Sequence, residues 1–230
     1  MTRAWTRPAA LLFAAAVVAS PAHVRAQDDR LFEGYDALWQ TLPHPAFTVR
    51  DERPLADPQT VDGQAYRAWA APRGHRVAWL GDTLTIDRRV FPFARASVFP
   101  GEVAGEPGAD ARLFVGSTDV CVQGTPPTAS GTAQRHTHVV AILDAFTPRA
   151  RRYDLPSLFG SCLALTRDAR PGLGFLAAAY HTPKGSEVSE GIAFERWRLR
   201  DGRFVRSADA ALAVRFVDPQ DVYRFRIASP

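Results

Sequence analysis

The chain has 230 residues, of which 46% are hydrophobic, and a formal net charge of +4. The first 26 residues contain Arg3, Arg7 and Arg25 and no acid, so the remainder carries 25 basic and 24 acidic side chains. This near-balance argues against a nucleic-acid partner, because nonspecific nucleic-acid affinity depends on neutralising backbone phosphates.

Residues 1–26 have the three parts of a secretion signal peptide. Two arginines precede an apolar run from Ala9 to Ala19, and the small residues Val24 and Ala26 suit a cleavage site. The apolar run is 11 residues long, whereas a membrane-spanning helix needs roughly 20. We therefore predict that the signal is removed, that the mature chain begins at Gln27 without a membrane span, and that the protein is periplasmic or extracellular.

Residues 27–58 are predicted to form one short amphipathic helix followed by a proline-rich extended segment. Pro43 would end the helix, and the sequence from there to Pro58 has no regular hydrophobic pattern. The apolar residues that recur on one face of this helix are Leu31, Phe32, Tyr35, Leu38, Trp39 and Leu42.

From residue 59 to residue 230 the hydrophobic period is two, which predicts a single antiparallel β domain. The many short strands, separated by turn residues, favour a β-sandwich or a partial propeller-like arrangement of sheets. A full propeller is disfavoured because no repeat of about 40 residues is visible. Besides two hairpins, strands are predicted at 64 to 71, 111 to 123, 137 to 143, 161 to 167, 173 to 181 and 222 to 227. The segment 207 to 217 has features of both a helix start and an alternating strand, and we favour the strand.

The two hairpins combine short turns with a consistent register. In the first, a turn at Gly81 and Asp82 sets Trp79 opposite Leu84. In the second, a turn at the Asp-Gly pair 201–202 sets residue 199 opposite residue 204.

Two segments depart from simple alternation. The buried parity changes between Glu195 and Arg196, which predicts a β-bulge or a strand break there. The run 139–143 is apolar at both parities, which predicts a central strand covered on both faces.

Cys121 and Cys162 are the only cysteines. An exported chain with two cysteines usually pairs them, so we predict a disulfide that closes a loop of about 41 residues. A reactive or metal-binding thiol is the alternative, but neither cysteine has an adjacent cation that would favour the thiolate.

Three histidines are the candidates for a metal site. His136 and His138 flank one residue at the start of a predicted strand, so both imidazoles point to the same face. His181, Glu187 or Asp144 would supply a third ligand, and zinc is the metal that such a set fits. The alternative is that these histidines are simply solvated or hydrogen-bonded side chains.

Sequence motifs for other chemistry are missing. The chain has no G-x-S-x-G elbow, so Ser157 and Ser161 are only the nearest candidates for a nucleophile. It also has no phosphate-binding glycine motif, and we predict no cofactor.

These observations favour an exported, soluble β domain that binds a protein partner or an envelope component, such as a periplasmic immunity or inhibitor protein. The expected binding regions are three long loops at 100–110, 124–132 and 181–191. The alternative is a small secreted metal-dependent hydrolase that uses His136 and His138. A third hypothesis is a structural envelope protein without a dedicated ligand, and the oligomeric state is left open.

Overall fold

The computed structural model describes residues 30–54, 59–61, 64–80, 83–93, 110–125, 131–167, 172–208 and 212–228. The predicted secretion signal lies outside the described residues, as do most of the predicted loops 100–110 and 124–132. No helix within the described ranges is long and apolar enough to cross a membrane.

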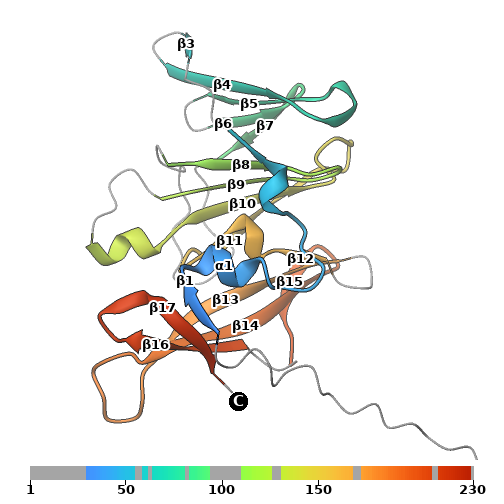
Figure 1. The fold of residues 1–230 in the computed structure, drawn as a ribbon. Coiled ribbons are helices and arrows are strands. Elements are labelled where there is room, and N and C mark those ends of the chain that lie inside the picture. The colour runs from blue at the N-terminus through green and yellow to red at the C-terminus, as the bar shows by residue number, and fades with distance from the viewer. Residues whose placement is uncertain are drawn as a thin grey trace, which may run out of the picture.

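Three antiparallel sheets, which we call A, B and C, are stacked in layers (Figure 1). Sheet C is the top layer in the figure, sheet B the middle layer and sheet A the bottom layer. The predicted mostly β, sandwich-like fold is confirmed, with stacked sheets instead of radially arranged blades.

Each sheet consists of neighbouring strands, which are named here in their spatial order. Sheet C contains β3 (Gln59–Val61), β4 (Gln64–Ala70), β5 (Arg76–Leu80), β6 (Thr83–Ile86) and β7 (Arg89–Pro92). Sheet B contains β11 (Arg151–Leu155), β10 (His138–Leu143), β9 (Val120–Gly124), β8 (Arg112–Val115) and β2 (Glu52–Arg53). Sheet A contains β1 (Leu31–Glu33), β17 (Asp221–Ala228), β16 (Leu212–Asp218), β14 (Gly191–Arg200), β13 (Leu173–His181) and β12 (Thr166–Arg167), and β15 (Arg203–Arg206) also pairs with β14.

Sheet B is buried on both faces, because one hydrophobic core lies between sheets A and B and a second lies between sheets B and C. Strand β10 contributes Val139 and Ala141 to the first core and Val140 and Ile142 to the second. The prediction of a central strand covered on both faces is therefore confirmed.

The N-terminal helix is shorter than predicted. Helix α1 spans only Tyr35–Trp39, and residues 31–33 form β1, which pairs with β17. Gly34, with a positive φ of 90°, separates the two elements. The predicted apolar face is nevertheless real, since Tyr35, Leu38 and Trp39 are buried in the first core. The following segment contains a 3-10 turn, η1 (Val49–Asp51), and then β2.

Two predicted strands are instead interrupted. The range 111–123 is a hairpin, β8 and β9, because the backbone turns between Gly116 and Asp119 and their main chains are hydrogen-bonded at 2.9 Å. The range 161–167 begins with a 3-10 turn, η4 (Cys162–Ala164), because the Ser161 hydroxyl accepts from the Leu163 amide at 3.1 Å.

Both predicted hairpin registers are confirmed. Trp79 pairs with Leu84, and Leu199 pairs with Phe204. Asp201 and Gly202 both have positive φ, as a type I′ turn requires.

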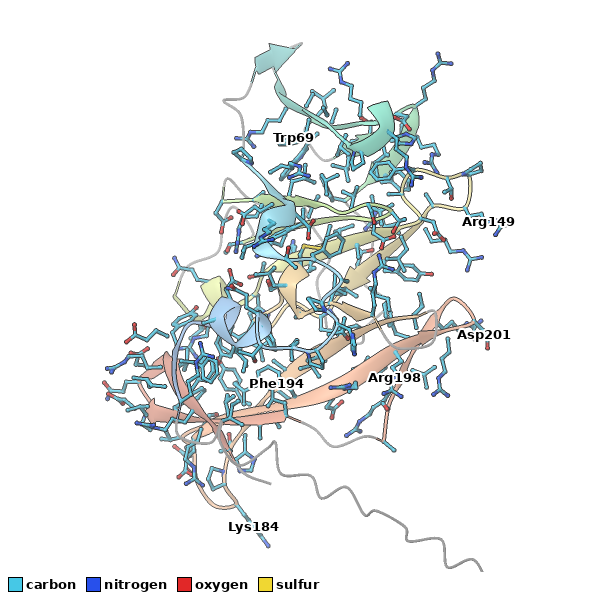
Figure 2. All side chains as sticks on the ribbon, turned by 45° about the vertical axis from the view of Figure 1, so that its right-hand side comes forward. Trp69, Arg149, Lys184, Phe194, Arg198 and Asp201 are labelled. Atoms are coloured by element: carbon cyan, nitrogen blue, oxygen red, sulfur yellow. A yellow bond between two sulfur atoms is a disulfide. The ribbon has the colours of Figure 1, made fainter. Side chains whose placement is uncertain are left out.

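The predicted bulge in β14 is wrong, because β14 pairs with β13 in one continuous register from residue 191 to residue 198. In its first half Phe194 is buried on the inner side of sheet A (Figure 2). In its second half Trp197 stacks on Phe175 with ring centroids 6.3 Å apart, and both rings pack against the same first core as Phe194. Residues of both parities therefore reach one core, which the twist of the strand explains without a bulge.

The predicted disulfide is confirmed. Cys121 in β9 and Cys162 in η4 are bonded, their Cα atoms are 5.9 Å apart and both residues are 0% exposed. The bond joins sheet B to the segment that leads into sheet A.

Candidate binding surface

Two tyrosines and an arginine form the most distinctive exposed group in the described part of the chain. Tyr180 at the end of β13 is 38% exposed and Tyr223 in β17 is 44% exposed. Arg135 ends a 3-10 helix, η3 (Gly131–Arg135), and its Nη1 atom donates to the Tyr180 hydroxyl at 2.8 Å. We call Arg135, Tyr180 and Tyr223 the tyrosine–arginine surface. In Figure 1, η3 lies on the same side of the molecule as β16 and β17.

A buried aromatic floor supports this surface. Phe159 and Tyr35 are both buried and stack on each other, with ring centroids 4.1 Å apart. The rings of Tyr180 and Tyr223 each meet Phe159 edge-on at 6.0 Å. The Tyr35 hydroxyl donates to the Val222 carbonyl at 3.0 Å. The two exposed rings therefore stand on a fixed base and have little freedom to lose on binding.

The charge of Arg135 acts on the neighbouring phenols. Desolvation raises the pKa of Tyr223, and the positive charge of Arg135 opposes that rise. Burial also raises the pKa of Tyr35, with Arg135 again acting in the opposite direction. Both hydroxyls therefore stay protonated at neutral pH and can donate hydrogen bonds.

Arg135 has no carboxylate partner within the ranges that the structure describes. Among the described residues, no acid therefore neutralises its charge, which leaves the charge available to an incoming anion.

His136 and Ser157, which were separate candidates in the sequence, lie together beside this surface. His136 Nδ1 and Ser157 Oγ are 2.8 Å apart, a distance that a nucleophile and its base require. Ser157 is only 4% exposed, however, so a substrate carbonyl has no approach to its oxygen. The backbone amides of Thr137, Phe159 and Gly160 already donate to main-chain carbonyls, so they are not available to stabilise an oxyanion. The contact positions the Phe159 segment.

The predicted metal ligands do not converge. His138 is 9% exposed and faces the second core, whereas His136 is exposed beside Ser157 and His181 is exposed at the end of β13. Asp144 and Glu187 are also exposed, the former in the turn after β10 and the latter in the loop after β13. No group of three or more His, Cys, Asp or Glu residues that could hold a metal ion occurs in the described part of the chain.

The segment that carries Phe159 is anchored next to the disulfide. The Gln123 side-chain oxygen accepts from the Cys162 amide at 2.7 Å and lies 3.1 Å from the Ser161 hydroxyl. Ser161 Oγ is also 3.3 Å from Asp36 Oδ1 in helix α1. Ser161, the other candidate nucleophile, is thus a buried structural residue.

An arginine joins α1 to sheet B on the same side. Arg112 in β8 contacts both carboxylate oxygens of Glu52 in β2, at 2.9 and 2.7 Å, and also pairs with Asp36. The hydrogen bonds from Arg112 hold the pKa of Glu52 below its ordinary value. Because Asp36 follows Tyr35, this network helps to position the aromatic floor.

Sequence reasoning missed this surface. Tyr223 lies in the predicted strand 222 to 227, and its ring is nearly half exposed. The surface and its floor come from five separate segments, so no local motif marks them. The only hint in the sequence was that two of these residues lie next to predicted loops. Arg135 follows the loop 124–132, and Tyr180 precedes the loop 181–191.

No protein-family model, no curated protein and no solved structure matches this chain. A proposal for its function therefore has to rest on the arrangement of its own side chains.

Proposed function

We propose that the protein is exported and binds a protein partner through the tyrosine–arginine surface. The observation that carries this proposal is the pair of half-exposed tyrosine rings packed edge-on against buried Phe159, with Arg135 bonded to one of them. Tyrosine and arginine are enriched at protein interfaces and often contribute most of the binding energy. Rings that are held in place before binding lose little entropy when a partner covers them.

Export is part of the same proposal. The signal-like residues 1–26 and the buried disulfide both suit an oxidising compartment outside the cytoplasm. The specific form that we favour is a periplasmic immunity or inhibitor protein, whose work is to bind one target tightly. A metal-dependent hydrolase that uses His136 and His138 stays a prediction, and the described residues contain no group of three ligands that supports it.

The experiment is an affinity capture with matched variants. The full chain is expressed with its own first 26 residues in an export-competent host, and N-terminal sequencing of the recovered protein tests for a start at Gln27. The purified, oxidised protein is then used as bait for an envelope extract of the source organism. The test variant is Tyr180→Ser/Tyr223→Ser.

The control variant, Val90→Ser/Val205→Ser, also removes two exposed apolar side chains, but from β7 and β15. One protein retained by wild type and control and lost from the tyrosine variant supports the proposal. Equal retention by the control and the tyrosine variant, or no retention by the wild type, would overturn it.

A further inference from the structure

The tyrosine–arginine surface offers hydrogen-bond donors and a positive charge. Arg135 donates to the Tyr180 oxygen, so the Tyr180 hydroxyl keeps its own proton for an outside acceptor. Donation from a charged guanidinium also polarises this hydroxyl and makes it a stronger donor. In the described ranges no side chain accepts from the Tyr223 hydroxyl, and no second group accepts from Arg135.

The cation and the two phenols lie around one buried ring. The Arg135 guanidinium carbon is 6.0 Å from the centroid of the Tyr180 ring, and the rings of Tyr180 and Tyr223 are each 6.0 Å from that of Phe159. Arg135 is also partly shielded from solvent, and such shielding strengthens its pairing with an anion. A ligand for this site must therefore accept several hydrogen bonds and carry negative charge.

We infer that the tyrosine–arginine surface recognises the carboxylate of an aspartate or glutamate side chain in the protein partner. This inference rests on the proposed function, because it names the group that the surface binds. A carboxylate only accepts hydrogen bonds, and its planar pair of oxygens matches the fork of a guanidinium. The exposed parts of the Tyr180 and Tyr223 rings would contact the apolar part of the same side chain.

The direct test uses small probes. N-acetyl-glutamate N-methylamide and N-acetyl-glutamine N-methylamide are titrated into the purified, oxidised protein at constant ionic strength. The signals of the arginine guanidinium and the tyrosine rings are followed by NMR. We expect saturable shifts at Arg135, Tyr180 and Tyr223 with the glutamate probe and none with the glutamine probe.

Three variants assign the effect. Arg135→Gln should abolish binding of the glutamate probe, and Tyr180→Phe, which keeps the ring, should weaken it about tenfold. Arg149→Gln is the control, because it removes a different exposed arginine, which Figure 2 shows at the edge of the molecule. This control should bind the probe as the wild type does.

The outcomes separate this inference from the proposed function. Equal shifts with both probes, or saturable shifts with inorganic phosphate but not with the glutamate probe, would overturn carboxylate recognition. If Arg135→Gln still captures the partner while Tyr180→Ser/Tyr223→Ser does not, the binding function stands and the carboxylate inference fails. Loss of capture in both variants, with a glutamate-specific shift, supports both.

Discussion

Replacing both cysteines by alanine tests how much stability depends on the covalent link between β9 and η4. The cysteines are separated by 41 residues in sequence, and a closed loop of this length restricts the unfolded chain by about 4 kcal/mol on the chain-entropy treatment. Both residues are fully buried, so removing the two sulfur atoms also leaves a small cavity that adds to the loss. We therefore expect Cys121→Ala/Cys162→Ala to lower the free energy of unfolding by at least about 4 kcal/mol.

The assay is urea unfolding followed by the fluorescence of tryptophan, since Trp39 lies in the first core next to η4. The double variant and the oxidised wild type are compared in the same buffer. The urea midpoint should fall, and the slope should rise because an unfolded chain without the crosslink exposes more surface. A loss below about 1 kcal/mol would refute the reasoning, since the loop would then already be ordered in the unfolded chain.

Three further changes follow from single contacts. Gly191→Ala places a Cβ 2.0 Å from the Val214 carbonyl oxygen, so we expect a loss of about 3 kcal/mol in urea unfolding, whereas Ala193→Ser in the same strand should change little. Arg112→Gln removes the bonds that lower the pKa of Glu52. It should cost about 1 kcal/mol at neutral pH. The part of this difference that depends on ionised Glu52 should be lost as the pH falls below the ordinary value of 4.5, so the difference from wild type should shrink there. The raised pKa of Tyr223 means that the folded state favours its neutral form. Stability should therefore decline as the pH rises above the ordinary value of 10.0, and Arg135→Gln should shift the phenol titration, read by ultraviolet absorbance, further upward. A downward shift in that variant would contradict the assigned effect of Arg135.

Much of the fold could be predicted from local sequence, because strand pairing here depends on turns and alternation. The Asp201-Gly202 turn fixed one hairpin register, and the doubly apolar run 139–143 identified the middle layer. Errors arose where a distant partner decided the structure. Residues 31–33 have helical spacing but pair with β17, and residues of both parities in β14 reach one core without a bulge because the strand twists.

The candidate surface was beyond prediction for a related reason. Histidines at 136 and 138 share a parity, but the second is covered by the core between two sheets and the first is bonded to Ser157. Only the stacking of sheets A and B brings Arg135 to Tyr180, which is 45 residues away in sequence. Alternation within one strand carries no information about which other segment will lie beside it.

The two-sided burial of sheet B has a consequence for how the molecule unfolds. Neighbouring residues in β10 belong to different cores, so neither core can be lost while the middle layer stays covered. A protein with two separate cores commonly unfolds in stages, but here sheet B contributes to both cores. Loss of either outer sheet would expose one apolar face of sheet B to water. We therefore expect the three sheets to unfold together in a single cooperative transition.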